Sequence, residues 1–72
     1  MKVFVDITLE QFDAWQGGKH TKERIISEDK QSDFEFLIDE LYPDGLEDTQ
    51  LNDLLRFDSD YIYESLGMEL EE

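Results

Sequence analysis

The sequence predicts a mainly α-helical (α+β) domain, in which one short N-terminal β-strand precedes four to five short helices. Three observations lead to this fold class. Apolar residues alternate at the N-terminus, they recur at helical spacing through most of the remaining chain, and capping residues or glycines separate the helical segments. A chain of 72 residues makes one domain, 1–72, and it contains no cysteine for a disulfide or a thiolate zinc site.

Residues 2–7 have the period-2 pattern of a β-strand. Val3, Val5 and Ile7 fall on one face of this strand, and Phe4 falls on the other with two charged residues. A single strand leaves its backbone N–H and C=O groups unpaired. We therefore expect it to pair either with another segment of the chain or with its own copy in a homodimer.

Two short helices are predicted next. Thr8, followed three residues later by Gln11, has the pattern of a capping box, in which two side chains bond backbone N–H groups at a helix start. Gly17-Gly18 is expected to end this helix, because glycine accepts the left-handed conformation of a helix C-terminus. Thr21 is expected to cap the second helix.

The third helix is predicted from Ser32 and Glu35, which form a second capping-box pattern. Residues 42–45 read Tyr-Pro-Asp-Gly, a turn that ends this helix. Between these signals, apolar residues follow the i, i+3, i+4, i+7 spacing of an amphipathic helix at Phe34, Leu37, Ile38 and Leu41.

Two more helices complete the chain. Asp48 or Thr49 is expected to begin the first of them, and Asp58 or Ser59 the second, which Gly67 ends. The apolar residues that these two helices contribute to the core are Leu51, Leu54, Leu55, Ile62 and Leu66.

Charge divides the chain into two parts. Residues 1–30 are nearly neutral, with six acids and five bases, whereas residues 31–72 carry fourteen acids and one base, a net charge of −13. The whole chain has a net charge of −14, which excludes direct binding to nucleic acid or to an anionic membrane surface because both would repel it. Residues 69–72 are expected to be frayed.

A cytoplasmic location is expected. Asp6 interrupts the N-terminal apolar stretch before it reaches the length of a signal-peptide core. No other run approaches the roughly 18 apolar residues that a membrane span needs.

An acidic face on the C-terminal helices is the candidate partner-binding site. Few of its members have a basic residue four positions further along a helix, so salt bridges within a helix do not explain them. Tyr61 and Tyr63 are candidate aromatic contacts beside it. The alternative is that the acids serve only solubility. The predicted face comprises Asp33, Asp39, Glu40, Asp44, Glu47, Asp48, Asp53, Asp58, Asp60 and Glu64.

No catalytic residue is predicted, and we expect a protein that is not an enzyme and has no cofactor. His20 is the only histidine, and its neighbours indicate an exposed turn. Neither Asp44 nor Asp58 begins a calcium-binding loop, because Leu46 and Ile62 stand where such a loop requires ligands. No metal site is predicted. Trp15 is expected to pack over the small core.

Four short patterns resemble small uncharacterised acidic proteins of Firmicute phages and mobile elements. They are W-x-G-G at 15–18, Y-P-D-G at 42–45, T-x-L-N-D-L-L-x-F at 49–57 and L-G at 66–67. Arg56 occupies an open position of the third pattern, where the resemblance leads us to expect an aromatic residue. By analogy with acidic phage inhibitors such as the DNA-mimicking anti-CRISPR proteins, the resemblance implies an inhibitor, in the cytoplasm of a host bacterial cell, that docks on a basic nucleic-acid-binding surface.

Two alternatives remain open at this point. The first is a phage accessory or regulatory protein that binds its partner through an apolar patch. The second is a metal-binding protein that uses clustered carboxylates.

Overall fold

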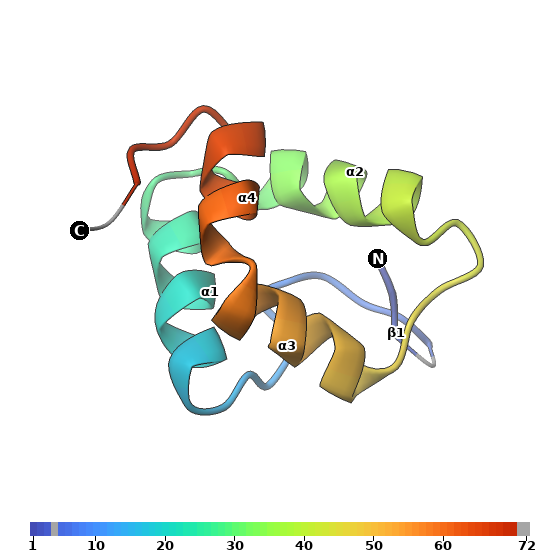
Figure 1. Ribbon diagram of the computed structural model, residues 1–72. Helices are drawn as coiled ribbons and strands as arrows, with labels where there is room; N and C mark the ends of the chain where they lie inside the picture. The colour runs from blue at the N-terminus through green and yellow to red at the C-terminus, as the bar shows by residue number, and fades with distance from the viewer. Residues whose placement is uncertain (4, 71–72) are drawn as a thin grey trace.

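The computed structural model describes residues 1–3 and 5–70 (Figure 1). This part of the chain is mainly helical, as predicted. It contains two short strands, β1 and β2, and four helices, α1 to α4. Their bounds are Lys2–Val3, Val5–Asp6, Gly17–Ser27, Gln31–Leu41, Asp48–Phe57 and Ser59–Ser65.

The single N-terminal strand predicted over residues 2–7 is not present. Instead, β1 pairs antiparallel with β2, with Lys2 opposite Asp6 and Val3 opposite Val5. Val3 also forms a parallel bridge with Leu46, and the Leu46 N–H donates to the Lys2 carbonyl at 3.0 Å. Within the described residues, β1 thus has two pairing partners, β2 and Leu46. The prediction for Phe4 lies outside the described residues.

The helix predicted from Thr8 to Gly17-Gly18 is wrong. The reciprocal capping bonds do form, since the Thr8 N–H donates to Gln11 Oε1 at 3.0 Å and the Gln11 N–H to Thr8 Oγ1 at 3.2 Å. Only a single turn follows them. The reason is tertiary: the Trp15 N–H donates to Asn52 Oδ1, 3.0 Å away, instead of bonding within a helix.

Gly17 and Gly18 begin helix α1 rather than ending a helix. The predicted cap Thr21 is therefore wrong, because it lies buried inside α1. A Cβ atom on Gly18 would meet Asn52 Oδ1 at 2.5 Å. Glycine is needed here for the close approach of α1 to α3, and α1 and α3 form the main helix pair of the molecule (Figure 1).

Helix α2 begins at Gln31, so Ser32 is not its cap. Glu35 does not complete a capping box either. Its carboxylate accepts hydrogen bonds from Gln31 Nε2 at 2.9 Å and from the Leu9 N–H at 3.2 Å, which ties α2 to the N-terminal segment. The predicted turn at 42–45 is confirmed, and Gly45 has φ +98°, which favours glycine.

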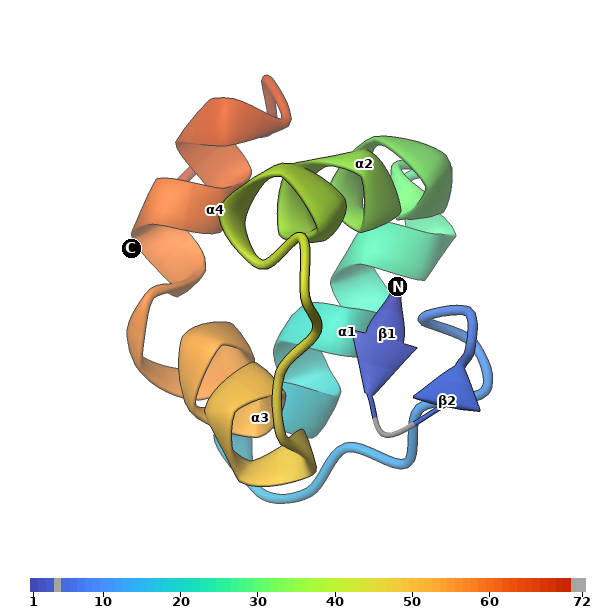
Figure 2. The ribbon, with the colours of Figure 1, turned by 90° about the vertical axis from the view of Figure 1, so that its right-hand side faces the viewer.

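The apolar face predicted for α2 is only partly correct. Phe34 and Ile38 are buried, Leu37 is half-buried, and Leu41 in the last turn is 43% exposed. The covered face is therefore narrower than the sequence pattern. In Figure 2, α2 lies at the top of the molecule, above α3.

The last two helices begin at Asp48 and Ser59, as predicted. A capping box is present at α3, but Glu47 and Gln50 form it, with the Glu47 N–H donating to Gln50 Oε1 at 2.8 Å. Gly67 ends the chain's last helical segment with φ +71°. The predicted core residues are buried except Leu54, which is half-buried; the buried ones are Leu51, Leu55, Ile62 and Leu66.

The elements surround one core. In Figure 2, α2 and α4 lie above α3, and the β1–β2 hairpin lies on the side of the molecule opposite α4. The radius of gyration is 10.9 Å and the extents are 33 × 23 × 18 Å. No described helix combines the length and the apolar character needed to cross a membrane.

Candidate protein-docking surface

The ten acidic residues predicted as a face all reach the surface. Nine of them are exposed and Asp48 is half-buried. Three have a structural task, which the sequence did not reveal. Asp39 lies 3.8 Å from the Met1 ammonium, Asp48 Oδ1 accepts the Thr49 N–H at 2.8 Å, and Glu47 belongs to the capping box of α3.

These acids do not form one continuous face. On α2, Asp33 and Glu40 line a hollow shared with the end of α4, whereas Asp39 lies on the flank near the N-terminus. Asp53 and Asp58 line a second hollow beside α3. The structure therefore spreads the predicted face over several flanks of the C-terminal helices.

The first hollow, the α2–α4 groove, has a volume of about 300 Å³. Its α2 wall is one flank of the helix, because its four residues follow the i, i+3, i+4, i+7 spacing. Phe36 is 66% exposed there, although it is a large apolar side chain. The residues that line the groove are Asp33, Phe36, Leu37, Glu40, Ser65 and Leu66.

The second hollow, the α3 groove, has a volume of about 290 Å³. Phe57 is 68% exposed in it, but the Arg56 guanidinium lies over its ring, 4.8 Å from the centroid. Arg56 is held in place because Nη1 donates to Gln16 Oε1 at 2.6 Å. The residues that line this groove are Tyr42, Gln50, Asp53, Leu54, Phe57 and Asp58.

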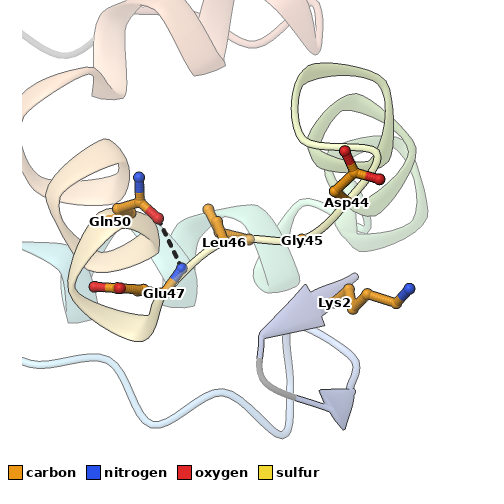
Figure 3. Close-up of a pocket in the computed structure, with 6 residues that line it drawn as sticks. All are labelled: Lys2, Asp44, Gly45, Leu46, Glu47 and Gln50. Atoms are coloured by element: carbon orange, nitrogen blue, oxygen red, sulfur yellow. Dashed lines mark hydrogen bonds between the residues drawn. The ribbon is translucent and has the colours of Figure 1, made fainter.

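A third hollow lies where the hairpin meets the start of α3 (Figure 3). Lys2 on β1 faces the turn that carries Asp44, and Glu47 and Gln50 form the far wall. Gln50 is already engaged in the capping box. Lys2 lines this hollow together with Asp44 and Glu47, so its positive charge offsets part of their negative charge.

The two predicted aromatic contacts have different environments. Tyr61 is 49% exposed and accessible to a partner. Tyr63 is 1% exposed, so its prediction as a contact is wrong. Residues two apart on a helix point in nearly opposite directions, and only one of the pair can face outward. The Arg24 guanidinium covers the Tyr63 ring at 4.3 Å from its centroid.

The charge of Arg24 on α1 is engaged by Glu28 on the same helix and by the ring of Tyr63 on α4. Burial acts to lower the pKa of Arg24, but hydrogen bonds with Tyr63 and Glu28 raise it above the usual value. Arg24 Nε donates to Glu28 Oε2 at 2.8 Å. This cation thus links α1 to α4, and it does not line the α2–α4 groove.

The remaining candidate residues are placed as follows. His20 is exposed within α1, so its prediction as a turn residue is wrong. Trp15 is 39% exposed and its ring lies 6.2 Å from that of the buried Phe12. Among residues 1–3 and 5–70, no three or more His, Asp or Glu side chains gather where they could hold a metal ion.

Phe36 and Phe57 are the site residues that sequence reasoning missed. Each interrupts the polar face of its helix, off the apolar stripe, and that position was the available signal. Together with the acids they make two apolar centres with anionic rims, an arrangement suited to protein docking. No protein-family model, curated protein or solved structure matches this chain.

Proposed function

We propose that this chain is a non-enzymatic inhibitor that docks its acidic C-terminal helices on a basic surface of a host protein. One observation carries the proposal. Nine of the ten predicted acids of residues 31–72 are exposed, in a part of the chain that has a single basic residue. A solvent-facing field of one sign steers an oppositely charged partner and speeds its association.

The amount of charge supports mimicry of nucleic acid. Duplex DNA carries one charge per about 1.7 Å, so the 33 Å length of this molecule corresponds to about 19 duplex charges. The net −13 of residues 31–72 is of the same order. Because the acids occupy several flanks, they suit a basic groove that surrounds the C-terminal helices better than a flat basic patch.

The kind of partner follows from the same charge and from the phage resemblance. A groove basic enough to accept such a density of carboxylates also has the charge needed to bind phosphates. We therefore propose a nucleic-acid-binding enzyme of the host bacterial cell as the partner, and an inhibitor of the DNA-mimic or anti-CRISPR type as the function. The chain would act in the cytoplasm and without turnover.

A matched pair of charge variants tests the proposal. One variant neutralises exposed acids of the C-terminal helices, Asp33→Asn, Glu40→Gln and Asp53→Asn. The control removes the same charge from exposed acids of the N-terminal part: Glu10→Gln, Asp13→Asn and Glu23→Gln.

We expect the C-terminal variant to bind a host protein captured from lysate roughly tenfold more weakly, because each exposed ion pair contributes about 0.2–1 kcal/mol. The control should bind like the wild type. Calorimetry on the purified partner measures both. Equal affinities for the two variants would refute the proposal.

A second candidate function is binding through an apolar patch, with the acids serving solubility. The exposure of Phe36 and Phe57 favours it. The salt dependence of partner binding distinguishes the two functions. At about 1 M salt the Debye length is near 3 Å, so a complex held by surface charges dissociates, whereas an apolar contact persists.

A further inference from the structure

We infer that the α2–α4 groove receives a basic segment of the partner, one that carries an apolar anchor between two Lys or Arg residues. The inference rests on the proposed function, and it places the centre of the docking interface at this groove. It follows from the shape of the groove, from the charges at its two ends, and from the contrast with the α3 groove.

The α2 wall of the groove places an apolar centre between two carboxylates. Phe36 and Leu37 occupy the middle, and Asp33 and Glu40 stand at the two ends. These acids are seven positions apart, which corresponds to about 10 Å along the helix axis. Leu66, which is buried, provides an apolar wall at the end of α4.

This order of groups determines the chemistry of the occupant. When an apolar side chain of the segment covers Phe36, the surfaces of that side chain and of the Phe36 ring are both removed from water. This burial supplies most of the binding energy. Cationic side chains on either side of that anchor reach Asp33 and Glu40, which fixes the register of the segment and repels acidic competitors. A segment with only one of the two features leaves either the ring or the carboxylates without a partner.

A second copy of this chain is a poor occupant. In a two-fold symmetric contact the same patch lies on both subunits, so Asp33 and Glu40 of one copy would face those of the other. Each copy also carries a net charge of −14, and the six residues that line the groove include no base. Both facts oppose self-association at this place.

The α3 groove is a natural comparison. Its Phe57 is as exposed as Phe36, at 68% and 66% respectively. The Arg56 guanidinium lies over the Phe57 ring and would repel a basic segment. Phe57→Ala is therefore a matched control for Phe36→Ala, since both variants truncate an exposed phenylalanine of a C-terminal helix.

Peptide display on the immobilised full chain tests the inference. Selection from a library of short random peptides should enrich sequences in which Lys or Arg residues flank an apolar residue. One enriched peptide, labelled for fluorescence anisotropy, should bind the Phe36→Ala variant at least tenfold more weakly than the wild type. The Phe57→Ala variant should bind it with unchanged affinity, and urea unfolding of both variants checks that the fold persists.

Three outcomes would overturn the inference: no enrichment, enriched peptides that lack basic residues, or equal effects of the two alanine variants. Its failure is distinguishable from that of the proposed function. If the captured host partner loses affinity for the acid-neutralised variant but not for Phe36→Ala, surface charge docks the protein and the groove does not. If neither change weakens binding of the partner to the chain, both proposals are refuted.

Discussion

Asn52 connects two parts of the molecule that lie far apart in the sequence, helix α3 and the segment that leads into α1. It is 1% exposed on α3, its Oδ1 accepts the Trp15 N–H, and its side chain meets Gly18 at the start of α1. In the sequence, a polar residue at this position only interrupts the apolar face of the helix. Its role could not be predicted because its partners are more than thirty positions away.

Gly18→Ala is expected to destabilise the protein by about 1–3 kcal/mol, because overpacking displaces well-fitted neighbours. The new Cβ would lie 2.5 Å from Asn52 Oδ1 and 3.1 Å from the Asn52 carbonyl oxygen, and a backbone atom cannot rotate away. Urea unfolding measures the change.

Gly17→Ala is the control for this prediction. Its Cβ would meet Arg56 Cγ at 3.1 Å, an atom of an exposed side chain that can yield by a few tenths of an ångström, and alanine has the higher helix propensity, so little stability should be lost. Equal losses in the two variants would contradict the role assigned to Gly18.

At the scale of elements, local signals succeeded where no tertiary contact competed with them. The starts of α3 and α4 and the turn at 42–45 were predicted correctly, since capping and turn residues there act on their own neighbours. The capping box at Thr8 formed but produced only one turn, because Asn52 takes a backbone N–H further along. A capping pattern reports a local bond, and packing decides whether a helix follows.

Helix α2 provides a test of which predicted apolar positions matter. Ile38→Ala should reduce the free energy of unfolding by about 2–5 kcal/mol, because it removes buried methyl groups and leaves a cavity. Ile38 is 1% exposed. Thermal or urea unfolding measures the loss.

Leu41→Ala is the comparison on the same helix. Leu41 is 43% exposed, so its truncation should change stability by about 0.5 kcal/mol or less. A large loss for Leu41→Ala would mean that the wider face expected from the sequence is the one that packs.

The whole molecule is asymmetric in charge, and that property was readable from the sequence. Counting alone places −13 of the −14 charges in residues 31–72. The arrangement of those charges was not readable, because it depends on how α2, α3 and α4 turn their flanks relative to one another. The expected homodimer rested on an unpaired strand, and β1 has partners within the chain in both β2 and Leu46.

Displacement of nucleic acid from the captured partner is the most direct test of the central claim. The partner is first loaded with a labelled oligonucleotide, and the chain is then titrated in at low salt, where the oligonucleotide stays bound in the absence of a competitor. The account predicts competitive release of the oligonucleotide, with roughly tenfold more of the acid-neutralised C-terminal variant required. A stable ternary complex of partner, oligonucleotide and chain would contradict it.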